Sequence, residues 1–146
     1  MKTRLTIVGA AGRMGRRITA LAAESGQFEI VAAVEHAACA EIGKDAGTVA
    51  GVASLNVAIG SSWPVESDVA IDFSLPQAAD ETLKQCVAGG IALVMGTTGL
   101  SDDQQKAIEG AARKIPVVYG TNMSVGMNVL FALVGKTAAI LLSLIH

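Results

Sequence analysis

A short apolar stretch that runs directly into three evenly spaced glycines is the feature that most constrains the fold of this chain. Residues 5–8 are Leu-Thr-Ile-Val, and Gly9, Gly12 and Gly15 follow at intervals of three. This order is typical of a strand, a tight turn and the start of a helix, where backbone N–H groups form a cradle for the pyrophosphate of a dinucleotide. In a chain with 16 glycines such a spacing can also arise by chance. The neighbouring strand and helix therefore decide how strongly it indicates a dinucleotide-binding turn.

Apolar runs alternate with helical spacing along the rest of the chain. Repeated alternation of strands and helices is typical of a parallel sheet with right-handed crossovers and helices on both faces. The sequence therefore predicts a Rossmann-like α/β fold with a doubly wound, mainly parallel sheet. Residues 37–60 are its least regular stretch. The expected strands are residues 4–8, 28–34, 57–59, 68–73, 91–95 and 116–119. The expected apolar face of the first helix consists of Met14, Ile18, Leu21 and Ala22.

An acidic residue stands at the end of the second expected strand, and in such sheets ligands bind at the carboxyl ends of the strands. Glu35 lies about 20 positions after Gly15, where a carboxylate accepts hydrogen bonds from the adenine-ribose hydroxyls. Without the glycines it would be interpreted as a solvated strand-end charge. A carboxylate there disfavours the 2′-phosphate of NADP, and a protonated His36 would partly offset this effect. We therefore expect NADH as the cofactor, with NADPH tolerated.

Two polar loops follow later strands, and each has two interpretations. Residues 96–99 (Gly-Thr-Thr-Gly) either bring backbone and two hydroxyls to a ligand or form a simple polar turn. In residues 120–126, Asn122 either orients a carboxamide or caps the next helix together with Ser124.

Three arginines lie in the first turns of the helix that follows the glycines. Cations there are unfavourable unless they meet an anion. We expect Arg13 to touch a cofactor, whereas Arg16 and Arg17 are expected to face solvent.

Composition argues against several function classes. Aromatic residues make up 3% of the chain and the formal net charge is −2, which offers neither stacking platforms nor a basic surface to nucleic acid. Cys39 and Cys86 lack metal-ligand spacing, so no metal site is expected. Residues 125–145 are long enough to span a bilayer, but Lys136 favours a docking helix instead. Because no signal-peptide core follows Met1, we expect a cytoplasmic protein with no membrane or nucleic-acid partner.

Four motifs together resemble those of a known family. Val-Gly-Ala-Ala-Gly-Arg-Met-Gly, Asp-Phe-Ser-x-Pro, Gly-Thr-Thr-Gly and Asn-Met-Ser-Val-Gly-x-Asn occur within residues 1–131, in an order and spacing similar to those of the bacterial dihydrodipicolinate reductases. The resemblance implies a homotetrameric NAD(P)H-dependent oxidoreductase of lysine and diaminopimelate biosynthesis, which reduces a dihydrodipicolinate-type cyclic imine to tetrahydrodipicolinate. It also implies that the cofactor contacts Gly9, Ala10, Ala11, Gly12, Arg13, Met14, Glu35, His36, Gly96, Thr97, Thr98, Gly120, Thr121, Asn122 and Met123.

The resemblance stops where the second domain of the family would begin. That domain carries a His-His-x-x-x-Lys motif and a Ser-Gly-Thr loop for the substrate, whereas the histidines here are His36 and His146. We therefore predict a dinucleotide-binding domain in residues 1–123 and, in residues 124–146, a helix leading toward a substrate domain that is missing. No catalytic residue is assigned to this chain. We expect cofactor binding without full activity, and self-association into a homo-oligomer; a stand-alone NAD-binding or redox-sensing module is the alternative.

Overall fold

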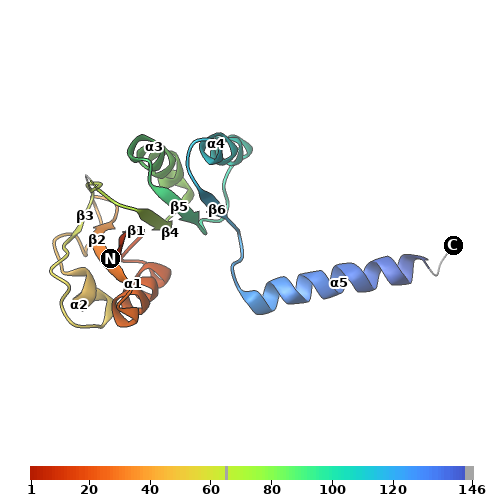
Figure 1. Cartoon of the computed structure of the whole chain (residues 1–146), viewed down its shortest axis with the longest axis horizontal. Coiled ribbons are helices and arrows are strands. Elements are labelled where there is room, and N and C mark those ends of the chain that lie inside the picture. Colours follow the sequence, from red (N-terminus) through yellow and green to blue (C-terminus); the bar gives the residue numbers. More distant parts are fainter. Residues whose placement is uncertain (65, 144–146) are drawn as a thin grey trace.

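The computed structural model describes residues 1–64 and 66–143. Within these residues, six strands form one parallel sheet in the order β3-β2-β1-β4-β5-β6 (Figure 1). The strands are β1 (Thr3–Val8), β2 (Phe28–Val34), β3 (Ile59–Gly60), β4 (Val69–Asp72), β5 (Ala92–Met95) and β6 (Val117–Tyr119). The helices are α1 (Arg13–Ser25), α2 (Ala46–Ala50), the 3₁₀ turn η1 (Pro76–Ala78), α3 (Ala79–Gly89), α4 (Asp102–Ala112) and α5 (Val125–Ser143). The predicted Rossmann-like fold is confirmed.

The order of the strands reverses beside β1, which pairs with β2 on one side and with β4 on the other. Leu5 is in register with Ile30 of β2 and with Val69 of β4. At such a switch point the two connections leave the sheet toward opposite faces, and a crevice opens at the carboxyl ends of the strands. The turns that follow β1, β2, β4, β5 and β6 therefore meet at one edge of the sheet.

Helices cover both faces of the sheet, so the strands bury side chains in both directions. α1 and α2 lie on one face, and α3 and α4 lie on the other (Figure 1). In β4, Val69 and Ile71 pack toward the first face while Ala70 packs toward the second. The buried cluster of the first face includes Leu5, Ile7, Ala22, Ile30, Ala33 and Ile59. The cluster of the second face includes Leu83, Cys86, Leu93, Met95 and Ile108. Burial of this apolar surface fixes the sheet edge from which the loops emerge.

Small residues line the buried face of α1. The buried residues of the helix are Gly15, Thr19, Ala20 and Ala22. Met14 and Leu21, which the sequence analysis placed on the apolar face, are 48% and 46% exposed, so this part of the expectation was wrong. α1 lies so close to the end of β1 that a Cβ atom on Gly15 would be 2.1 Å from the carbonyl oxygen of Gly9.

The stretch that we expected to be irregular contains a short helix, α2, and a two-residue strand, β3. The side chain of Asp45 holds this region together. Its Oδ1 accepts hydrogen bonds from Thr48 N at 2.9 Å and from Leu55 N at 3.2 Å, and its Oδ2 accepts one from Val57 N at 3.1 Å. These side-chain bonds add to backbone hydrogen bonds between the same segments, such as Ala46 N to the carbonyl oxygen of Val57 at 2.8 Å.

The last helix, α5, extends away from the sheet and its covering helices (Figure 1). None of its residues is buried, and by length and composition it is apolar enough to cross a membrane, with a mean hydropathy of 1.9. A helix that is apolar on all sides is normally enclosed, either by protein or by lipid. The described structure contains nothing that encloses this one.

Candidate functional site

The turn after β1 is packed tightly against two neighbouring segments. Gly9 has a φ of +77°, and a Cβ atom there would lie 3.0 Å from the backbone N and Cα of Ser74. A Cβ atom on Gly12 would lie 3.2 Å from the carbonyl oxygen of Gly9. The left-handed φ of Gly9 favours glycine, because a side chain there would be strained. The turn is therefore held between α1 and the loop that follows β4.

The N-terminus of α1 carries no internal partner for its first N–H groups. Its N-cap residue is Gly12, no side chain caps it, and no acidic residue lies in its first turn. By contrast, α4 begins with a complete capping box between Ser101 and Gln104. Arg13 and Met14 are exposed at the uncapped end. The positive end of the helix dipole, unpaired donors and an arginine together favour an anion at this position.

Glu35 lies directly beside this turn. Its Oε1 accepts a hydrogen bond from Ala11 N at 2.9 Å, and its Oε2 accepts one from His36 N at 3.2 Å. The backbone N–H of Glu35 donates to the carbonyl of Gly60, which fixes the start of the loop. A carboxylate can accept about four hydrogen bonds, so Glu35 retains capacity for a ligand hydroxyl. The structure thus brings Glu35 and the glycine turn together, as the sequence analysis expected.

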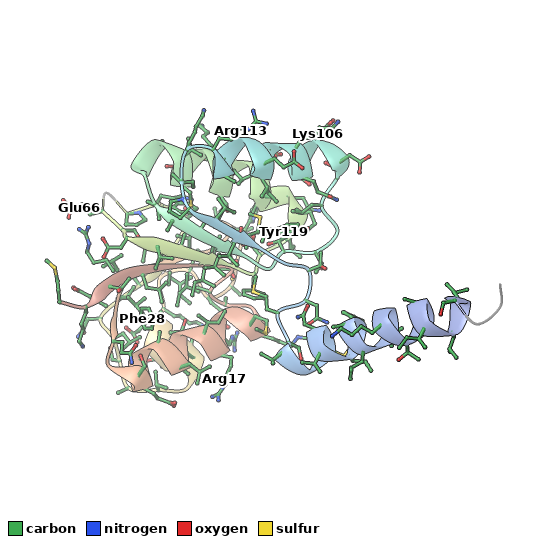
Figure 2. All side chains as sticks on the ribbon, turned by 45° about the vertical axis from the view of Figure 1, so that its right-hand side comes forward. Arg17, Phe28, Glu66, Lys106, Arg113 and Tyr119 are labelled. Carbon is green, nitrogen blue, oxygen red and sulfur yellow. The ribbon has the colours of Figure 1, made fainter. Side chains whose placement is uncertain are left out.

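The arginines of α1 differ in their surroundings. Arg13 is exposed beside the glycine turn. Arg16 is 44% exposed, but it does not simply face solvent as we expected: its Nε donates to the carbonyl oxygen of Ala11 at 2.7 Å, and its Nη2 lies 3.5 Å from Glu41 Oε1. Arg17 extends into solvent (Figure 2). His36 is exposed, and its Nδ1 accepts a hydrogen bond from Ala38 N at 3.2 Å.

A buried carboxylate, to which the sequence analysis assigned no role although it begins the Asp-Phe-Ser-x-Pro motif, connects two of the loops. Asp72 at the end of β4 is 0% exposed. Its Oδ1 accepts hydrogen bonds from Ser74 N at 2.7 Å and from Thr97 Oγ1 at 3.3 Å, while Oδ2 has no partner among the described residues. The main-chain carbonyl of Asp72 also accepts from Gly96 N at 2.8 Å. The sequence signal that could have identified Asp72 is an acidic residue at the end of an otherwise apolar strand.

The loop after β5 is shaped by this contact and by an aromatic ring. A Cβ atom on Gly96 would lie 2.3 to 2.8 Å from ring atoms of Phe73, so glycine is required where the ring lies. Thr97 is buried and directs its hydroxyl toward Asp72, whereas Thr98 is exposed. Thr97 therefore fixes the loop rather than offering its hydroxyl to a ligand, and Thr98 carries the accessible hydroxyl.

The loop after β6 leads into α5. Gly120 N donates to the carbonyl of Met95 at 3.1 Å, which ties this loop to β5. Asn122 Oδ1 accepts from Ser124 N at 2.9 Å, and Ser124 Oγ accepts from Met127 N at 3.4 Å. The structure shows the helix-capping contact of Asn122, and a contact of its side chain with a carboxamide stays a prediction. Thr121 and Met123 are exposed on the same loop.

Two surface recesses lie elsewhere. A groove of about 590 Å³ runs between α3 and α4, lined by residues such as Leu83, Val87 and Gly110. A second recess of about 350 Å³ lies near the β2–β3 edge, beside Trp63. Neither of them contains the glycine turn, Glu35 or Asp72. Among the described residues, no group of three or more His, Cys, Asp or Glu side chains is arranged to hold a metal. The candidate site is therefore the open sheet edge.

The sheet order and the glycine turn define a Rossmann-like domain of the class that binds dinucleotides. The profile of the family described as "Dihydrodipicolinate reductase, N-terminus" matches residues 3–123, and the chain belongs to this family. It is 47% identical over 129 residues to a 4-hydroxy-tetrahydrodipicolinate reductase of Rhodopirellula baltica, covering 85% of this chain and 46% of that protein. Over 142 residues it is 43% identical to the 4-hydroxy-tetrahydrodipicolinate reductase of Anaeromyxobacter dehalogenans strain 2CP-1, and the match covers 95% of this chain and 53% of that protein.

A solved structure shares the same fold. Dihydrodipicolinate reductase from Paenisporosarcina sp. TG-14, with dipicolinate bound, superposes with a TM-score of 0.51 and 25% identity. The match covers 75% of this chain and 43% of that chain. The chain thus spans about half the length of the relatives that it matches.

Proposed function

We propose that this chain is the cofactor-binding part of an NAD(P)H-dependent reductase of lysine and diaminopimelate biosynthesis, which reduces a dihydrodipicolinate-type cyclic imine to tetrahydrodipicolinate. The observation that carries the proposal is the position of Glu35, 2.9 Å from Ala11 N of the glycine turn. A carboxylate beside such a turn is the arrangement that binds adenosine ribose next to pyrophosphate. Membership of the family supports the reaction class.

The residues present fit a dinucleotide. The uncapped N-terminus of α1 and Arg13 would hold the pyrophosphate, and Glu35 would accept hydrogen bonds from the adenine ribose. The nicotinamide end would lie near residues 96–98 and 120–123. When bound, such a cofactor supplies hydride chemistry. The residues of this chain would bind and orient the cofactor, and Asp72 holds the loop after β5 in place.

We further propose that NADH is preferred and NADPH tolerated. The carboxylate of Glu35 would repel a 2′-phosphate. His36 cannot offset this through Nδ1, because that atom accepts a hydrogen bond from Ala38 N. Only Nε2 of the ring remains free to meet a phosphate in this arrangement.

A binding titration tests the proposal directly. NADH is titrated into the purified chain by isothermal calorimetry, with Glu35→Gln as the site variant and Glu29→Gln as the matched control. Glu29 lies in the same strand, β2, and is exposed. We expect Glu35→Gln to weaken NADH binding about tenfold, since each hydrogen bond from a ligand hydroxyl to a charged group contributes about 1.5 kcal/mol or more. Glu29→Gln should bind like the wild type. Failure of the wild type to bind NADH would contradict the proposal.

We also propose that the chain alone binds the cofactor without efficient turnover, and that it acts in the cytoplasm. Hydride transfer requires the substrate to be held against the nicotinamide. Among the described residues, the loops after β5 and β6 carry neither a histidine nor a lysine. The test follows NADH absorbance at 340 nm with freshly generated substrate of the reductase. Robust oxidation that depends on that substrate would contradict this part of the proposal.

A further inference from the structure

A chain of charged contacts lies beside the glycine turn, on the surface between α1 and the loop after β2. Arg16 Nη2 lies 3.5 Å from Glu41 Oε1, and Lys44 Nζ lies 2.7 Å from Glu41 Oε2. Glu41 thus engages two cations with its two carboxylate oxygens. Its side chain is 25% exposed, against 44% for Arg16 and 59% for Lys44, so the carboxylate is the most enclosed member of the group.

Ala11 connects these charges to the ribose-binding position. Its N–H donates to Glu35 Oε1, and its carbonyl oxygen accepts from Arg16 Nε at 2.7 Å. The guanidinium of Arg16 and the carboxylate of Glu35 therefore lie on either side of the same residue. Arg16 is a cation at the adenosine end of the site, but both of its hydrogen bonds turn it toward protein oxygens.

We propose that Glu41 is a specificity-determining residue that disfavours NADPH by holding Arg16 and Lys44 away from the 2′-phosphate. This inference rests on the proposed binding of a nicotinamide dinucleotide and concerns the same site. A phosphate group carries a charge of about −1.5 to −2 at neutral pH and is recognised by arginine and lysine. The charges of Glu35, Glu41, Arg16 and Lys44 cancel, so the cluster offers no net attraction to such a group.

The pairing persists at neutral pH. The hydrogen bond from Lys44, with the positive charges of Lys44 and Arg16, lowers the pKa of Glu41 below its ordinary value. The carboxylate is therefore ionised at neutral pH, where both cations are charged, and it competes with any anion for them. Removing its charge leaves Arg16 and Lys44 free to reorient and makes the cluster net positive.

The test compares Glu41→Gln with Glu81→Gln. Glu81 is a matched control, because it also pairs with a lysine, Lys84 at 3.6 Å, and accepts from an amide, Gln85 Nε2, but it lies in α3 away from the site. Dissociation constants of NADH and NADPH are measured by calorimetry at low ionic strength. We expect Glu41→Gln to bind NADPH about tenfold more tightly, equivalent to one charge-assisted hydrogen bond, and to bind NADH like the wild type. The gain should shrink in 0.5 M salt.

A double variant identifies the cation. Adding Arg16→Ala to Glu41→Gln should remove most of the gain for NADPH, and a gain that survives would overturn the role of Arg16. An unchanged ratio of NADPH to NADH affinity in Glu41→Gln, or the same change in Glu81→Gln, would overturn the inference while NADH binding by the wild type still supports the proposed function. If the wild type binds neither dinucleotide, both the inference and the proposed function are contradicted.

Discussion

Asp72 and Thr97 are joined by a hydrogen bond that solvent does not reach. Thr97 Oγ1 donates to Asp72 Oδ1 at 3.3 Å, and the two residues are 1% and 0% exposed. The bond connects the ends of β4 and β5, which are neighbours in the sheet although 25 residues separate the partners. It fixes the loop beginning at Gly96 against the loop beginning at Phe73. Two of the loops at the proposed cofactor site therefore share one buried anchor.

Removing this hydroxyl should destabilise the protein. Thr97→Val keeps the shape of the side chain but leaves Asp72 Oδ1 with Ser74 N as its hydrogen-bond donor in a site where Oδ2 has no partner. We expect a loss of about 1.5–3 kcal/mol in the free energy of unfolding, because the lost bond is to a carboxylate. Thr97→Ser keeps the hydroxyl and should lose about 1 kcal/mol or less. Urea denaturation measures both, and equal stability of the two variants would contradict the role of the bond.

Two glycine-to-alanine substitutions should have opposite effects. Gly15→Ala places a Cβ atom 2.1 Å from the carbonyl oxygen of Gly9, whereas a Cβ atom on Gly110 in α4 meets nothing within 4 Å. The first should cost about 3 kcal/mol or more, since α1 must move away from the turn. The second should stabilise by about 0.5–1 kcal/mol through helix propensity. Thermal unfolding of both variants checks the signs, and a stable Gly15→Ala would show that the turn tolerates displacement.

Sequence patterns predicted five of the strands to within one residue at each end, because these are short, mostly apolar runs, whereas the third strand, expected at residues 57–59, is Ile59–Gly60. The strand at Phe28–Val34 was predicted to the residue. α2 was missed because its five residues are too few for periodicity. What stabilises it is the Asp45 side chain, which reaches as far as Val57. Met14 and Leu21 were misplaced because helical spacing does not report how closely the helix approaches the sheet.

The position of Glu35 could be predicted from the sequence, because it follows from its place at the end of β2. The hydrogen bond between Asp72 and Thr97 depends on β4 pairing with β5, which no local pattern reports. No local pattern reports the contact between Arg16 and Glu41 either, because the two residues are 25 positions apart in the sequence. Contacts of the expected cofactor residues with a dinucleotide stay predictions until a titration tests them.

Acid should unfold the protein partly through Asp45. The hydrogen bond from Thr48 N, together with those from Leu55 N and Val57 N, lowers the pKa of Asp45 from 3.8 to about 2. Because the folded-state pKa is depressed, this stabilisation is complete above about pH 4 and is lost as the pH falls through about 2. Asp45→Asn should lower stability at pH 7 and flatten the decline between pH 4 and 2. Urea midpoints across that range measure it, with Asp103→Asn, 93% exposed, as the control for loss of one charge. Parallel profiles for wild type and Asp45→Asn would contradict the prediction.

The two cysteines should differ in reactivity. Burial, and then the charge of Asp72, raises the pKa of Cys86 to about 12, and its side chain is 0% exposed. At pH 8 the thiolate fraction would be about one in ten thousand. Cys39 is partly exposed. An aromatic disulfide reagent should therefore modify one thiol rapidly and the second only in denaturant, and Cys39→Ser should abolish the rapid phase. A rapid phase that persists in Cys39→Ser would show that Cys86 is reached in the folded protein.

The exposure of α5 predicts self-association. Leu133 and Leu141 lie two turns apart on this helix and are each 56% exposed, among further apolar side chains on every side. Apolar surface of this extent is normally covered, and we expect copies of the chain to cover it for one another. Changing both leucines to glutamate should shift sedimentation velocity toward the monomer, because charged side chains on this surface oppose its burial between copies. Leu75→Glu introduces a charge at a residue that is 71% exposed outside the helix, and it should leave the assembly intact. A wild-type chain that sediments as a monomer at every concentration would contradict the prediction.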